Sequence, residues 1–89
     1  MATENIDVTK TWTLLAEDTD AIVLISSTYP GAIQYATTAT EVEPEVEGHT
    51  LNTVTPLTRD QIGTGFIWGR VGPDEYIGAS TPVVVVVTK

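Results

Sequence analysis

The chain has 89 residues, no cysteine, one histidine and a formal net charge of −8. A domain of this length buries a thin core, and such domains often gain stability from disulfides, a metal or an oligomer. Disulfides are excluded here. His49 alone cannot build a structural zinc site, which needs about four Cys or His ligands. The remaining source of additional stability is assembly with other copies of the chain or attachment to a larger structure.

With twelve acidic residues and four basic ones, the chain lacks the positive charge that would attract nucleic acid or anionic lipid. No run of about 18 apolar residues predicts a membrane span. Residues 1–5 have neither the basic start nor the apolar segment of a secretory signal. We therefore expect a protein that is made in a cytoplasm, needs no cofactor and has no nucleic-acid or membrane partner.

Thr, Val and Ile are frequent and no segment shows a sustained helical period, so the sequence predicts an all-β domain. Residues 1–7 are polar and predict a flexible N-terminal arm, followed by a single domain over residues 8–89. The first predicted strand covers residues 8–15. Its alternation places three apolar side chains on one face: Val8, Trp12 and Leu14.

Residues 21–25 are apolar on both faces, which is typical of a central strand. Pro30 and Gly31 fit a type II turn, which predicts a hairpin into a strand over 32–38. Glycine turns then flank a strand over 66–71, and the last strand begins at Val83. About six or seven short strands predict a small antiparallel β-sandwich or a partly closed barrel.

Four glutamates alternate with apolar residues between the predicted strands. They are Glu41, Glu43, Glu45 and Glu47, and the residues between them are Val42, Pro44 and Val46. If the run is extended, the carboxylates line one face, and Pro44 restricts the run to an edge strand or a long loop. A row of like charges is typical of a solvated edge that blocks edge-to-edge pairing. Docking on a basic partner and binding of a hard cation such as calcium are the alternatives.

No constellation in the sequence predicts catalysis. The chain has no cysteine nucleophile and no Gly-x-Ser-x-Gly elbow, and no spacing links a serine to His49, the one available base. The large aromatic side chains have two interpretations: core filling, or a sugar-stacking platform. These residues are Trp12, Tyr29, Tyr35, Trp68 and Tyr76.

Five consecutive valines form the last predicted strand: Val83, Val84, Val85, Val86 and Val87. Alternation directs the first, third and fifth to one face and the other two to the opposite face. One face fills the core, and the other needs a second sheet or a neighbouring subunit, because an uncovered apolar strand promotes aggregation. These valines, with Trp12 and Trp68, are the candidate interface for an oligomer or a capsid; the glutamate row is a weaker candidate for docking a partner.

Three short motifs occur in a fixed order: Trp12-x-Leu14-Leu15-Ala16, then Gly48-His49-x-Leu51, then Trp68-Gly69-Arg70 ahead of the valine strand. Over most of residues 8–88 the chain thereby resembles small β domains of tailed-bacteriophage virion proteins, found as head decoration proteins or at the start of head-fibre and tail-fibre proteins. The pattern has a small residue such as Ala where this chain has Gly69, and the glutamate row is unusually acidic for it.

The resemblance implies a structural virion protein, made in the host cytoplasm, that decorates the capsid exterior as a homo-oligomer, a trimer. Its partners are then further copies of itself and the major capsid protein or another virion protein. A tail-fibre or head-fibre adaptor is the alternative within the same class. A carbohydrate-binding module with exposed Trp or Tyr is the alternative from another class.

Overall fold

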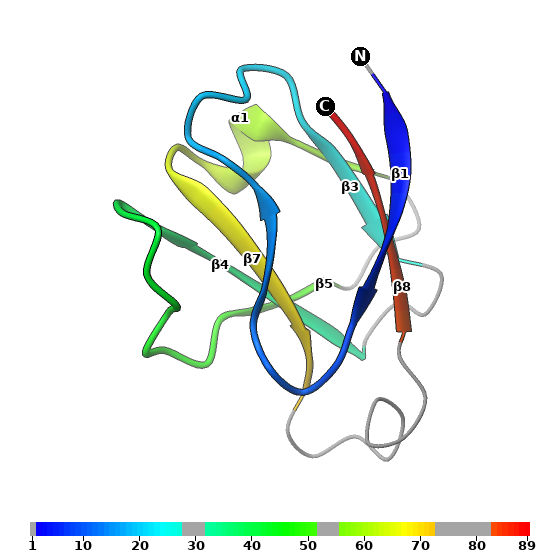
Figure 1. Cartoon of the computed structure of the whole chain (residues 1–89), viewed down its shortest axis with the longest axis vertical. Helices are drawn as coiled ribbons and strands as arrows, with labels where there is room; N and C mark the ends of the chain where they lie inside the picture. Colours follow the sequence, from blue (N-terminus) through cyan, green and yellow to red (C-terminus); the bar gives the residue numbers. More distant parts are fainter. Residues whose placement is uncertain (1, 28–31, 52–55, 73–82) are drawn as a thin grey trace.

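The computed structural model describes residues 2–27, 32–51, 56–72 and 83–89. They form two four-stranded antiparallel sheets, with the strand order β1-β8-β3-β6 in sheet A and β2-β7-β4-β5 in sheet B (Figure 1). The strands are β1 (Thr3–Val8), β2 (Thr13–Ala16), β3 (Leu24–Ser27), β4 (Ile33–Thr38), β5 (His49–Leu51), β6 (Leu57–Thr58), β7 (Phe66–Val71) and β8 (Val83–Thr88). A helix of four residues, α1 (Arg59–Ile62), lies between β6 and β7. The predicted all-β sandwich is confirmed, with eight strands in the described ranges rather than six or seven.

Residues 3–7 belong to a strand rather than to the flexible arm that their polarity predicted. β1 pairs with β8 from Thr3 opposite Thr88 to Val8 opposite Val83, and the backbones of Ala2 and Lys89 exchange two hydrogen bonds. Sheet hydrogen bonds use the backbone, so polar side chains that face solvent on an edge strand do not prevent pairing. Figure 1 shows the two ends of the chain side by side.

The predicted strand over 8–15 is divided between the two sheets. β1 ends at Val8, the chain crosses over, and β2 begins at Thr13 in sheet B. Because of this crossing and an irregularity within β2, Leu15 is buried, whereas Trp12 and Leu14 are half-buried. The prediction that Val8, Trp12 and Leu14 share one apolar face is therefore wrong.

The predicted hairpin between residues 21–25 and 32–38 is also wrong. β3 lies in sheet A between β8 and β6, as expected for a central strand, but β4 lies in sheet B between β7 and β5. The chain therefore crosses from one sheet to the other between β3 and β4. The proposed turn at Pro30 and Gly31 lies outside the described residues.

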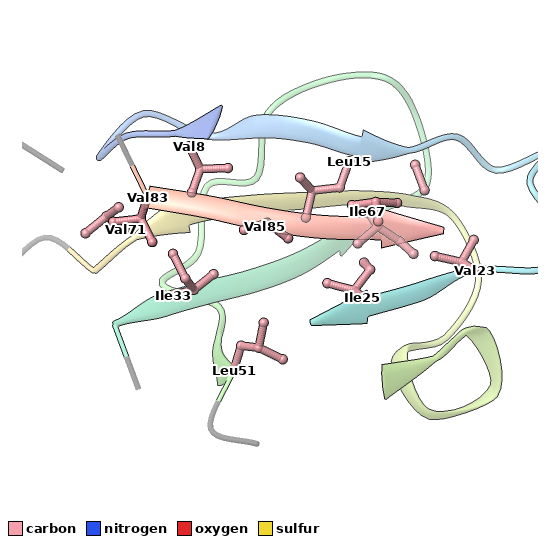
Figure 2. Packing of buried hydrophobic residues seen from close by; sticks show 12 residues of the cluster. Val8, Leu15, Val23, Ile25, Ile33, Leu51, Ile67, Val71, Val83 and Val85 are labelled. Carbon is pink, nitrogen blue, oxygen red and sulfur yellow. The ribbon is translucent and has the colours of Figure 1, made fainter. Parts of the chain in front are cut away.

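The core lies between the two sheets, and the valines of β8 alternate as predicted. Val83, Val85 and Val87 are buried, while Val84 and Val86 are half-buried on the other face. Figure 2 shows Val83 and Val85 of β8 together with Val71 and Ile67 from β7 of the opposite sheet. The other buried members of the cluster are Val8, Leu15, Ala16, Val23, Ile25, Ile33, Leu51, Ile67 and Val71.

The Arg59 side chain ties together two turns that are distant in sequence. Its guanidinium donates hydrogen bonds to the carbonyl oxygens of Glu17 (2.7 Å) and Asp20 (2.6 and 3.0 Å), and to those of Gly63 (3.2 Å) and Gly65 (2.8 Å). Only a planar guanidinium has enough donors in a fixed fork to serve these four carbonyl groups together. The turn between β2 and β3 is thereby fixed to the turn between α1 and β7.

No helix in the described part of the chain is long and apolar enough to cross a membrane.

We expect Arg59→Lys to lower the free energy of unfolding by about 1–3 kcal/mol, because the ammonium leaves several partly buried carbonyl oxygens without a donor. The substitution keeps the charge, so the loss reports hydrogen-bond geometry. Urea denaturation followed by circular dichroism measures the change. An unchanged unfolding midpoint would show that the two turns hold without the guanidinium.

Candidate functional site

The outer face of sheet A carries almost no charge. Residues that lie directly opposite each other in a sheet share a face, and the strand register therefore fixes the members of this one. They are Thr3, Asn5, Asp7, Leu24, Ser26, Thr58, Val84, Val86 and Thr88. Asp7 is the one charged side chain among them, although the chain has a net charge of −8. Half-buried Leu24, Val84 and Val86 make the middle of this face apolar.

The structure narrows the predicted interface on the last strand. Val83, Val85 and Val87 pack in the core of the single chain, so they cannot contact a partner. Trp68 has 8% of its surface exposed, and its Nε1 donates a hydrogen bond of 2.8 Å to Thr38 Oγ1. Of the seven candidate interface residues, Val84, Val86 and Trp12 are half-buried and the other four are buried.

The glutamate row lies in the loop over residues 39–48, which joins β4 to the edge strand β5. Of the two predicted placements, edge strand or long loop, the loop is the one observed. The condition for a shared carboxylate face, an extended run, is not met: Pro44 is buried, whereas Val42 and Val46 are 66% and 62% exposed. The backbone bends at 39–42 and again at 45–46, so alternate residues no longer point the same way.

This loop and Trp12 enclose an open groove of about 630 Å³, which we call the Trp12 groove. Its lining comes from the crossing between β1 and β2, from the loop and from β7: Trp12, Val42, Glu43, Pro44, Glu45, Val46, Glu47 and Arg70. The groove therefore combines an indole ring, exposed aliphatic side chains and carboxylates. It lies beside sheet B and contains no residue of the outer face of sheet A.

Arg70 contacts several of the segments that form the Trp12 groove. The guanidinium carbon lies 4.4 Å from the centre of the Trp12 ring, a cation–π geometry. Its Nε donates to Gln34 Oε1 at 3.0 Å, and one terminal nitrogen donates to the Glu47 carbonyl oxygen at 3.2 Å. β4, β7 and the loop are joined through this one side chain.

The glutamates do not gather into a metal site. Within the described residues, no group of three His, Cys, Asp or Glu side chains is arranged to hold a metal ion. The cation-binding interpretation of the row therefore has no geometry to support it. The carboxylates are distributed along the loop instead.

Among the described residues, no serine lies in one site with His49. Ser26 and Ser27 lie on β3 in sheet A, whereas His49 begins β5 in sheet B and is exposed. The His49 ring contacts Tyr35 instead, with ring centres 5.6 Å apart. Ser80, Tyr29 and Tyr76 lie outside the described residues.

The three motifs of the sequence meet beside the Trp12 groove. Trp12 stacks on Arg70, and Gly48 lies against the Trp12 ring with a backbone φ of +87°. A Cβ at Gly48 would come within 2.9 Å of the indole and 2.7 Å of the Tyr35 carbonyl oxygen. Sequence reasoning missed the groove, because its lining comes from a crossing, a loop and a strand that are distant in the sequence.

We expect Gly48→Ala to destabilise the protein more than Gly63→Ala. Both glycines have positive φ, so an alanine at either position is strained by roughly 1–3 kcal/mol. Gly63 has open space where a Cβ would lie, whereas Gly48 does not, and overpacking adds about 1–3 kcal/mol. Thermal unfolding of both variants measures the difference; equal melting temperatures would contradict the close packing of Gly48 against Trp12.

Comparison of the chain with protein-family models, with curated proteins and with solved structures found no match.

Proposed function

We propose that this protein is a structural virion protein of a tailed bacteriophage, which decorates and stabilises the capsid surface as a homo-oligomer, a trimer. The observation that carries the proposal is the outer face of sheet A. It presents half-buried Val84 and Val86 between neutral polar side chains, on a chain whose other strand faces and loops bear most of the acidic residues.

Electrostatic repulsion selects the surface on which copies of this chain associate. Each copy carries a net charge of −8, so like-charged surfaces that approach closely repel each other. Contact is least unfavourable where charge is lowest and apolar surface is available. The outer face of sheet A meets both conditions, since Val86 lies between the neutral Asn5 on β1 and Ser26 on β3.

The three sequence motifs pack against one another in this fold. Trp12, Gly48 and Arg70 come from three motifs distant in sequence, and they are in contact or close approach in the structure. Their co-occurrence in one chain thus has a structural reason. Copies bound to the shell would stabilise it by mass action, because binding favours the folded and assembled state.

The carbohydrate-binding alternative has less support from the geometry. Trp68 is almost fully buried and bonded to Thr38, and Arg70 stacks on Trp12. A sugar-stacking platform needs an open aromatic face. A head-fibre or tail-fibre adaptor uses the same kind of interface, and copy number per particle separates it from a decoration protein.

We expect the purified protein to sediment as an oligomer at micromolar concentration and to bind expanded capsids of its own phage saturably, raising their melting temperature. Val86→Lys should weaken self-association at least about tenfold, since one buried valine contributes roughly 1.5–3 kcal/mol. Val42→Lys, on the exposed loop of sheet B, is the matched control and should associate like the wild type. A wild-type monomer that does not bind capsids would refute the proposal.

A further inference from the structure

We propose that the Trp12 groove binds an extended, lysine-bearing peptide segment of a partner protein. This goes beyond the proposed function, since it concerns a different surface and a different partner from self-association. The groove lies beside sheet B, and its lining shares no residue with the outer face of sheet A. Both surfaces are therefore available at the same time.

The apolar component of the groove fits aliphatic side-chain stems. Val42 and Val46 are 66% and 62% exposed, and they lie on either side of the buried Pro44 in the loop. Leaving two valines in water is unfavourable, and each gains from contact with methylene groups. A lysine side chain offers four methylenes along with a charged end that stays near solvent.

The charge of the groove selects a cationic occupant. Glu43, Glu45 and Glu47 line it, and within the described residues none of the three is in an ion pair. Arg70 is the one cation in the lining, and its guanidinium is already engaged by Gln34, by the Glu47 carbonyl and by the Trp12 ring. Three carboxylates against one guanidinium leave the groove negative.

The distribution of the carboxylates favours a peptide over a single ion. The glutamates occupy alternate positions of the loop, and they do not converge as a metal site requires. The loop bends, so these carboxylates do not share one side; an extended peptide with several lysines can still reach them, because each ammonium group sits on a flexible four-carbon stem. Such a segment meets distributed carboxylates one after another while its stems pack on the valines.

The experiment titrates a capped heptapeptide, in which three lysines alternate with glycines, into the full chain at physiological ionic strength, with calorimetry as the readout. The groove variant is Glu43→Gln, Glu45→Gln and Glu47→Gln together. The matched control is Glu4→Gln, Glu17→Gln and Asp60→Asn together, which makes the same change in net charge outside the groove and outside the outer face of sheet A. Melting temperatures establish that both variants are folded.

We expect the wild type and the control to bind the peptide with similar affinity, and the groove variant to bind at least tenfold more weakly. Val46→Thr should also weaken binding, because the stems lose an apolar contact. Equal losses in groove variant and control would mean general charge attraction and would overturn the proposal. It would also fail if no binding occurs at about 1 mM peptide, or if a neutral chitin oligosaccharide binds the groove in place of the peptide. None of these results depends on whether the protein forms trimers or binds capsids.

Discussion

The two-layer structure depends on β8, because this strand alone joins β1 and β3 within sheet A. β1 and β3 have no pairing with each other; each pairs with one edge of β8, in registers that set Val85 opposite Ile6 on one side and Ser27 on the other. The core side chains that β8 contributes to sheet A are Val83, Val85 and Val87. β1 and β8 are among the most distant segments of the sequence, so their pairing requires closure of a long loop.

Because the core is thin, polar contacts fix the turns and loops that connect the strands. The chain has no disulfide, and Arg59 and Arg70 take over part of that role by binding backbone and side-chain oxygens of distant segments. Arg59 stabilises the turns at one end of the sandwich, and Arg70 fixes the loop over residues 39–48 beside sheet B. Both arginines of an acidic chain thus have structural positions, and Lys89 likewise donates a hydrogen bond of 3.1 Å to the Leu15 carbonyl oxygen, while most carboxylates are exposed to solvent.

The positions of strands could be predicted from the sequence where apolar residues alternate or run together and where turn residues mark the strand ends. β7 was expected over residues 66–71 and β8 over 83–87, because each has a strong β pattern and β7 is bounded by glycines. β1 was missed, since its pairing depends on a partner about 80 residues away rather than on its own polar side chains. The crossing of β4 into the other sheet was missed for the same reason. The roles of Arg59 and of the Trp12 groove could not be predicted, because Arg59 binds backbone carbonyl oxygens and the groove depends on where the chain crosses and bends, and no side-chain pattern records either.

The two faces of β8 differ: the inner valines stabilise the fold, and we propose that the outer ones mediate assembly. The absence of cysteine allows a direct test, in which the thiols of Val86→Cys and Val42→Cys variants are alkylated over a range of protein concentrations. The account predicts that alkylation at position 86 slows as concentration rises into the micromolar range, while alkylation at position 42 keeps its rate. A rate at position 86 that does not change with concentration would contradict it.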